Sequence, residues 1–265
     1  MRGRKIVNVK IGTCGYGFYK PPKGWKEKYK NKLQAFSHDF KLVELNRTFY
    51  KLPMQKTVKR WRKEVQHAFE FTVKAWQAIT HPTSSPTWKE KDKLSKDQHK
   101  QFGYFNPGKE VIDAWESIRK RANGLQANIV VFQTPKSFDY SKEHIENMYS
   151  FFTKINRDKL KLAWEPRGKW NEHRSEIKEI CNDLKLIHIV DILRRKPVSD
   201  HPTCYLRLHG LNENEYNYNY EYSKKQIRKL AEKLQDLSET YDEIYCLFNN
   251  FQMFKNAHQL KKMIS

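Results

Sequence analysis

Short apolar runs recur eight times along the chain, and each is followed by a segment of helical spacing or by a loop. This alternation is typical of parallel α/β folds, in which a crossover helix follows each strand. The runs predict strands at Ile6–Gly12, Leu42–Asn46, Glu70–Lys74, Asn128–Gln133, Lys161–Glu165, Lys185–Asp191, Thr203–His209 and Glu243–Asn249. Because eight parallel strands close into a barrel, we expect an α/β fold of the (β/α)8 TIM type.

Helical periodicity between the runs supports this fold. Apolar residues recur at helical spacing in two sets: Val58, Trp61, Val65 and Ala68, and Ile227, Leu230, Leu234 and Leu237. The connection after the third strand, from about Ala75 to Ala127, is much longer than a crossover needs. We therefore expect an enlarged connection near the barrel mouth. A length of 265 residues suits one such barrel, so a single domain over residues 1–265 is expected.

The cysteines and the N-terminus indicate in which cellular compartment the protein is expected. The chain has four widely separated cysteines and no CxxC pair, which indicates neither a zinc ribbon nor a disulfide framework. A reducing compartment fits this usage. The first ten residues lack the apolar core of a signal peptide, and no run approaches the length of a membrane span. A cytoplasmic protein without a membrane partner is expected.

The chain is strongly basic, with 51 lysine and arginine residues against 30 acidic residues and a formal charge of +21. Such an excess attracts polyanions at long range, so the expected partners are RNA, DNA or a small phosphorylated ligand. A lysine-rich, solubilising surface explains the same charge equally well. The charge therefore limits the classes of partner without choosing among them.

Polar or charged residues stand at or just after the ends of most predicted strands. In a TIM barrel the carboxyl ends of the strands and the loops that follow them build the active site. We therefore expect one shared pocket that gathers these residues: Glu44, Asn46, Lys74, Gln133, Glu165, Asp191, Arg207, His209, Asn249 and Asn250.

Seven ordered motifs span almost the whole chain. They are IGTCGYGF at Ile11–Phe18, VELNRTFYKLP at Val43–Pro53, FEFTVKAWQAITHP at Phe69–Pro82, QTPKSF at Gln133–Phe138, AWEPRGKW at Ala163–Trp170, YLRLHG at Tyr205–Gly210 and LFNNF at Leu247–Phe251. With these motifs the chain resembles the YecE-like family, a group of TIM barrels catalogued as the seventy-second domain of unknown function. The resemblance implies a closed barrel with its motifs at one mouth, and it implies no established reaction.

Four residues are the catalytic candidates: Glu44, Glu165, Asp191 and His209. Carboxylates that converge at a barrel mouth can bind a divalent metal ion through their oxygen atoms, with the histidine as a further ligand. They can also divide into a general acid and a general base. A third interpretation is that they form salt bridges to Lys74, Arg167 and Arg207 and stiffen the mouth. A divalent metal ion is thus a candidate cofactor, with these four residues as its candidate ligands.

Cationic, amide and aromatic side chains are the substrate-binding candidates. An arginine fork binds phosphate or carboxylate in a bidentate manner, so an anionic ligand is inferred. Asparagine and glutamine orient hydroxyl groups, a base edge or a water molecule. The full set of candidates is Asn46, Tyr50, Lys74, Gln133, Arg167, Trp170, Arg207, Asn249 and Asn250.

Two aromatic segments carry further hypotheses. The stretch Lys20–Lys32 places Trp25 and Tyr29 among lysines, a composition suited to single-stranded nucleic acid. The tract Glu215–Tyr222 has a tyrosine at every second position, so an extended chain puts the rings on one side. Such a row forms either a stacking platform or a cover on the barrel rim.

Three functions follow from these features. The preferred hypothesis is an enzyme acting on a phosphate-bearing substrate, a nuclease-like hydrolase of nucleic-acid phosphodiesters whose catalytic residues hold a metal ion or activate water. The second is an isomerase or lyase acting on a sugar or a sugar phosphate. The third is a nucleic-acid-binding barrel without catalytic activity, whose binding would depend steeply on salt.

Overall fold

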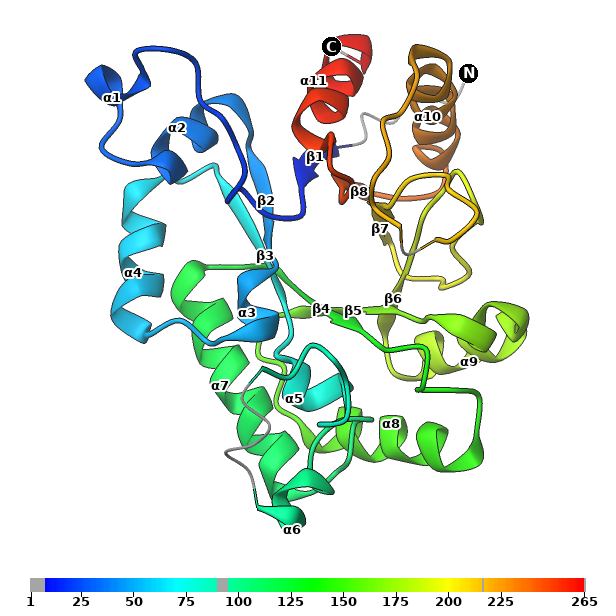
Figure 1. Cartoon of the computed structure of the whole chain (residues 1–265). Helices are drawn as coiled ribbons and strands as arrows, with labels where there is room; N and C mark the ends of the chain where they lie inside the picture. The colour runs from blue at the N-terminus through cyan, green and yellow to red at the C-terminus, as the bar shows by residue number, and fades with distance from the viewer. Residues whose placement is uncertain (1–7, 90–94, 216, 265) are drawn as a thin grey trace. The chain divides into compact units, whose positions relative to one another are not determined.

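The computed structural model in Figure 1 describes residues 8–89, 95–215 and 217–264. Eight parallel strands form a closed barrel in chain order. They are β1 (Asn8–Thr13), β2 (Leu42–Leu45), β3 (Glu70–Lys74), β4 (Ile129–Gln133), β5 (Lys161–Glu165), β6 (Leu186–Val190), β7 (Thr203–Leu208) and β8 (Glu243–Phe248). The predicted (β/α)8 barrel is confirmed. Of the first predicted strand, Ile6 and Val7 lie outside the described residues.

Helices follow the strands as expected for this fold. They are α1 (Trp25–Lys28), α2 (Lys32–Asp39), α3 (Arg47–Tyr50), α4 (Gln55–Glu64), α5 (Gln77–Thr80), α6 (Lys96–His99), α7 (Lys109–Leu125), α8 (Lys142–Lys154), the 3-10 helix η2 (Gly168–Glu172), α9 (Arg174–Asp183), α10 (Lys224–Leu237) and α11 (Met253–Ile264). A capping box between Ser223 and Gln226 begins α10. The expected helix through Val65 and Ala68 is wrong at its end, because α4 stops at Glu64.

The chain forms two compact units. Unit 1 comprises Met1–Glu44, Lys63–Glu70 and Ile187–Ser265, and unit 2 comprises Leu45–Arg62 and Phe71–Leu186. The single domain over residues 1–265 stays a prediction.

In unit 1, β8 pairs with β1 on one side and with β7 on the other. The register runs from Asn8↔Glu243 to Thr13↔Phe248 and from Thr203↔Glu243 to Leu208↔Phe248. Helices α10 and α11 lie side by side, and α11 also contacts β1 and β8 (Figure 1). Buried Ile227, Leu230 and Leu234 form the inner face of α10, as the periodicity predicted.

In unit 2, β4 pairs with β3 and with β5, and Gln133 and Glu165 are register partners at the ends of their strands. The predicted enlarged connection after β3 contains α5, α6 and α7. Gly103 lies there against the end of α5, with a φ of +85° and its amide bonded to the Ala78 carbonyl. A Cβ atom at Gly103 would lie 2.5 Å from the His81 carbonyl carbon, so only glycine fits this approach.

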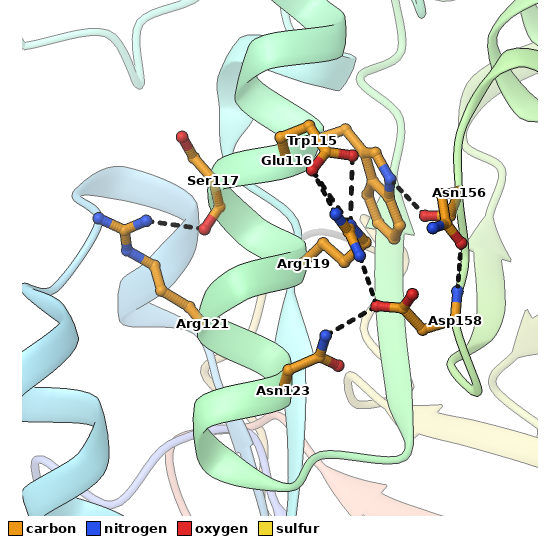
Figure 2. A network of polar contacts seen from close by, with 8 residues as sticks. All are labelled: Trp115, Glu116, Ser117, Arg119, Arg121, Asn123, Asn156 and Asp158. Atoms are coloured by element: carbon orange, nitrogen blue, oxygen red, sulfur yellow. Dashed lines mark hydrogen bonds and ion pairs between the residues drawn. The ribbon is translucent and has the colours of Figure 1, made fainter.

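A polar network fixes α7 to the turn before β5 (Figure 2). Arg119 donates to Glu116 on its own helix and, at 2.6 Å, to Asp158 in the turn. Asn123 donates to the same Asp158 oxygen at 2.8 Å, and the Trp115 indole donates to the Asn156 carbonyl at 2.9 Å. These contacts lie before β5 begins, so they hold the strand without occupying its carboxyl end.

Candidate functional site

The carboxyl ends of β3, β4 and β5 bring two cations together in unit 2. Lys74 donates to Oε1 of Gln133 at 3.1 Å, and Arg167 donates to the same oxygen at 2.9 Å. The Nε atom of Arg167 also bonds Glu165 at 3.1 Å. The pairing of Gln133 with Glu165 across β4 and β5 explains why one arginine reaches both. We call Lys74, Gln133, Glu165 and Arg167 the cation cluster.

The cation cluster is partly shielded from solvent. Lys74 lies 4.0 Å above the ring of Phe49, a cation–π contact on the first turn after β2. Its side chain and that of Gln133 are buried, whereas the Arg167 side chain retains 13% exposure. Charges in such a shielded place interact more strongly than charges in bulk water.

His81 lies at the end of α5 and faces these cations. Its ring packs edge-on against Phe49 at 4.8 Å, and its Nδ1 atom lies 2.8 Å from the Thr80 hydroxyl. Burial, together with the positive charges of Lys74 and Arg167, lowers the pKa of His81 to about 3. His81 is therefore a neutral imidazole at physiological pH, able to give or accept a hydrogen bond without adding charge.

The other substrate-binding candidates of unit 2 lie in different surroundings. Tyr50 is exposed at the end of α3 and packs edge-on against Phe49. Asn46 stands at the start of α3. Trp170 is fully buried in η2 and packs against Trp164 at 5.0 Å, so in this conformation it supports the loop after β5 and does not face a ligand.

In unit 1, Glu44 and Arg207 form a buried ion pair. The guanidinium donates to Glu44 at 2.8 Å, and the Tyr205 hydroxyl donates to the second carboxylate oxygen at 2.9 Å. The side chains of Glu44 and Arg207 are 0% and 1% exposed. The salt-bridge interpretation is confirmed for this pair, and Arg207 does not stand at an open rim as an anion-binding cation.

Asp191 follows β6 in unit 1 and receives three donors. Its carboxylate accepts the backbone amides of Leu193 at 3.0 Å and of His209 at 3.1 Å, together with the Tyr222 hydroxyl at 3.4 Å. Burial raises the pKa of Asp191 to about 6, although the donors and the charge of Arg194 favour the ionised form. A carboxyl group that titrates near neutral pH is suited to proton transfer.

His209 and Asn249 are brought together by strand register. Because Leu208 pairs with Phe248, the next residues of both strands lie side by side, and Asn249 Nδ2 lies 3.1 Å from His209 Nδ1. Asn250 turns away and bonds the Tyr220 carbonyl and Asn256, which is a structural role.

The tyrosine tract forms a cover for this part of unit 1. The Tyr218 ring lies 5.3 Å from His209, while Tyr222 is buried against Phe248. The Tyr222 hydroxyl accepts the Gly210 amide and donates to Asp191. Asn217, Asn219 and Glu221 are exposed, so the predicted alternation is confirmed for the described tyrosines, while Tyr216 lies outside the described residues.

Two arginines directly after β6 bind groups of the protein itself. Arg194 donates to the carbonyls of Gly210 and Asn212 at 2.8 and 2.6 Å, and Arg195 pairs with Glu215. These contacts fix the loop after β7 to the loop after β6.

The candidate carboxylates have protein partners. Among the residues that the structure describes, no group of three or more histidine, cysteine, aspartate and glutamate side chains is arranged to hold a metal ion. Glu44 is matched by Arg207, Glu165 by Arg167 and Asp191 by backbone amides. The metal centre predicted from Glu44, Glu165, Asp191 and His209 stays a prediction.

A cavity of about 1170 Å³ lies elsewhere in unit 1. It is lined at the amino ends of β1, β2 and β3 by Lys10, Leu42 and Glu70, and beside them by α10 and α11. In TIM barrels this end of the strands serves stability, whereas the chemistry is at the carboxyl ends. We therefore place the candidate groups at the carboxyl ends of the strands, which carry the cation cluster in unit 2 and Asp191 in unit 1.

Two residues that contact the candidate groups were not among the predicted ones: His81 in unit 2 and Tyr205 in unit 1. His81 lies several residues beyond the end of β3, so strand-end reasoning does not reach it, although the motif at Phe69–Pro82 contains it. Tyr205 stands two residues before Arg207 on β7, and side-chain alternation places both on one face.

Comparison with known proteins agrees with the barrel. The family described as protein of unknown function DUF72 matches residues 10–265. UPF0759 protein YunF of Bacillus subtilis is 24% identical, over 97% of this chain and 93% of its own length. A crystal structure of a DUF72 family protein from Thermotoga maritima has a TM-score of 0.71 at 24% identity, covering 97% of this chain and 99% of that one.

More distant solved structures share the fold alone. A xylose isomerase domain containing protein from Salmonella typhimurium has a TM-score of 0.54 at 14% identity, covering 87% of this chain and 90% of that one. An AP endonuclease of family 2 from Brucella melitensis has a TM-score of 0.52 at 11% identity, covering 97% and 98%. A D-tagatose 3-epimerase-like protein has a TM-score of 0.54 at 15% identity, covering 96% and 95%.

No helix within the described ranges is long and apolar enough to cross a membrane. The resemblance to the YecE-like group is confirmed over nearly the whole length, and the chain belongs to the DUF72 family.

Proposed function

We propose that the protein is an enzyme that acts on a phosphate-bearing substrate, with hydrolysis of nucleic-acid phosphodiesters as the preferred reaction. The observation that carries the proposal is the convergence of Lys74 and Arg167 on one oxygen of Gln133. Two cations that meet at one neutral oxygen concentrate positive charge at one position, and lysine and arginine are the side chains that bind phosphate oxygens.

The charge balance of the cluster favours an anion. Lys74 and Arg167 contribute two positive charges against the single carboxylate of Glu165, and His81 adds no charge because its pKa is about 3. Phosphate oxygens accept hydrogen bonds both from a lysine ammonium group and from the planar guanidinium group of an arginine. The partial exposure of Arg167 leaves a route for such a group to approach.

Phosphodiester hydrolysis suits the groups around this anion position. Water attacks phosphorus, the bond to one ester oxygen breaks, and the proton released by the water ends on the leaving oxygen. Lys74 and Arg167 stabilise the charge on the phosphoryl oxygens as it develops. Glu165, next to Arg167, is proposed to take the proton from the attacking water and to pass it on to the leaving oxygen.

The activity test uses the purified full chain with labelled RNA and DNA in the presence of Mg²⁺, Mn²⁺ or Zn²⁺. Cleavage is expected, and it should fall by about 10²-fold or more in Glu165→Gln and Arg167→Met. Lys169→Met is the matched control. Lys169 is exposed and lies two residues from Arg167, and its substitution removes the same charge. Absence of cleavage with every polymer and metal would defeat the hydrolase proposal.

The cation cluster also suits the alternative substrate class of sugar phosphates. A thermal shift with sugar phosphates, absent with oligonucleotides and lost in Arg167→Met, would favour an isomerase or lyase. Retained salt-dependent oligonucleotide binding in Glu44→Gln and Glu165→Gln, without any covalent change, would favour a non-catalytic binding protein.

A further inference from the structure

Two phenylalanine side chains stand exposed on neighbouring loops of unit 1. Phe18, in the loop after β1, is 87% exposed, and Phe251, in the loop after β8, is 72% exposed. Because β1 and β8 pair up to Thr13↔Phe248, the two loops leave the sheet at the same level and side by side. Burial of a phenylalanine normally stabilises a fold, so two open rings on adjacent loops indicate a contact surface.

The backbone that carries these rings is anchored. Tyr19, directly after Phe18, is buried, and its ring lies 5.3 Å from that of Phe254 in α11 and 5.4 Å from that of Phe36. The amide of Phe251 donates to the Tyr218 carbonyl at 2.9 Å. The backbone next to each exposed ring is therefore held in place by these contacts.

The segment that follows Phe18, which runs through α1 to the start of α2, is strongly basic. It contains a run of lysines at Lys20, Lys23, Lys26, Lys28, Lys30 and Lys32, with Glu27 as the single acid among them. The first five of these lysines are exposed. Positive charge on the same segment as an open aromatic ring matches a ligand that carries both phosphates and flat bases. We call Phe18, Phe251 and these lysines the β1–β8 rim.

We infer that the β1–β8 rim binds single-stranded nucleic acid, with bases stacked on Phe18 and Phe251 and the phosphates near the lysines. The inference rests on the proposed function, because it takes the substrate to be a polynucleotide. Stacking on a phenyl ring tolerates any base, so the rim binds without sequence preference.

The test measures fluorescence anisotropy of labelled thymidine and uridine oligonucleotides, about twelve nucleotides long, a length within the range of single-strand binding sites. The double variant Phe18→Ala/Phe251→Ala should weaken binding by roughly tenfold or more. Met54→Ala is the matched control, because Met54 is an apolar side chain of unit 2 that is 60% exposed. Equal loss of affinity in both variants would overturn the role of the two rings.

Salt dependence tests the lysines. The triple variant Lys20→Ala/Lys23→Ala/Lys26→Ala should reduce the slope of log affinity against log salt by about two, because each phosphate contact to a single strand contributes roughly 0.7. The control is Lys224→Ala/Lys225→Ala/Lys229→Ala, which removes three exposed lysines of α10. The same reduction in the control would place the attraction in the overall charge and overturn a dedicated rim.

Inorganic phosphate separates this inference from the proposed function. Phosphate binding that depends on Arg167, together with no binding of any oligonucleotide, overturns the rim and leaves the cation cluster standing. Oligonucleotide binding that depends on Phe18 and Phe251, with no phosphate binding, supports the rim and removes the cation cluster. Binding of anionic phospholipid vesicles in place of oligonucleotides overturns the rim in favour of a membrane surface.

Discussion

Arg207 donates a hydrogen bond of 2.8 Å to Glu44 while both side chains are buried in unit 1. Removing one partner leaves an uncompensated buried charge, which costs ~3–5 kcal/mol, far more than loss of an exposed pair. Glu44→Gln should therefore lower the free energy of unfolding by about that amount in urea denaturation. Replacing both partners, in Glu44→Gln/Arg207→Met, should recover part of the loss.

The exposed pair Lys109–Asp113 provides the control, since Asp113→Asn should change stability little. A small effect of Glu44→Gln would contradict this account.

Asp191 should make stability depend on pH between about 4 and 6. Burial raises its pKa in the folded protein from 3.8 to about 6, so the folded state binds the proton more tightly than the unfolded state. Its contribution to the free energy of unfolding is therefore fully present below pH 4 and is lost as the pH rises through 6. The total loss is up to about 3 kcal/mol. The difference in unfolding free energy between the wild type and Asp191→Asn, measured from pH 4 to 7, should decrease with pH. A difference that is constant over this range would show that Asp191 has an ordinary pKa.

His81 should remain neutral in mildly acidic solution. Its pKa is lowered to about 3 by burial first and by Lys74 and Arg167 second. The stability that the neutral ring contributes is present above pH 6.5 and is lost as the pH falls toward 3. Nitrogen chemical shifts in NMR should therefore show a neutral ring at pH 5, with exposed His38 as the reference signal. Lys74→Met should raise the pKa of His81, although not to 6.5, because burial remains. A protonated His81 at pH 5 in the wild type would refute the shielded site.

Gly103 should tolerate no side chain. Its positive φ is unfavourable for other residues, and a Cβ atom would meet the His81 carbonyl carbon at 2.5 Å. Gly103→Ala should destabilise the protein by more than ~1 kcal/mol and speed amide exchange in α5. Gly17→Ala is the control, because a Cβ atom there meets nothing within 4 Å. Similar melting temperatures for the two variants would contradict the close contact.

The sequence pattern predicts the barrel well because strand burial and strand length are local properties. Each of the seven strands from β2 to β8 lies where an apolar run is found, and polar residues such as Gln133 and Glu165 follow from the ends of those runs. The side-chain pairing is less predictable. Glu44 and Arg207 are far apart in sequence, and only the packed barrel decides that they neutralise each other.

Two further features depend on tertiary structure. His81 reaches Phe49 and the cations because α5 turns back after β3, a path that no periodicity encodes. Tyr222 bonds Asp191 because the tyrosine tract folds over the end of β7, which requires the left-handed backbone of Gly210. Sequence reasoning named Asp191 and the tract separately and did not connect them.

The central claim is that Lys74, Gln133 and Arg167 bind the phosphate of the substrate. Isothermal titration of the full chain with inorganic phosphate tests it most directly, with Arg167→Met and the control Lys169→Met measured alongside. We expect saturable binding to the wild type and to Lys169→Met, and a loss of at least tenfold in Arg167→Met, as for a charged hydrogen bond. Equal phosphate affinity in Arg167→Met and in the wild type would contradict the claim.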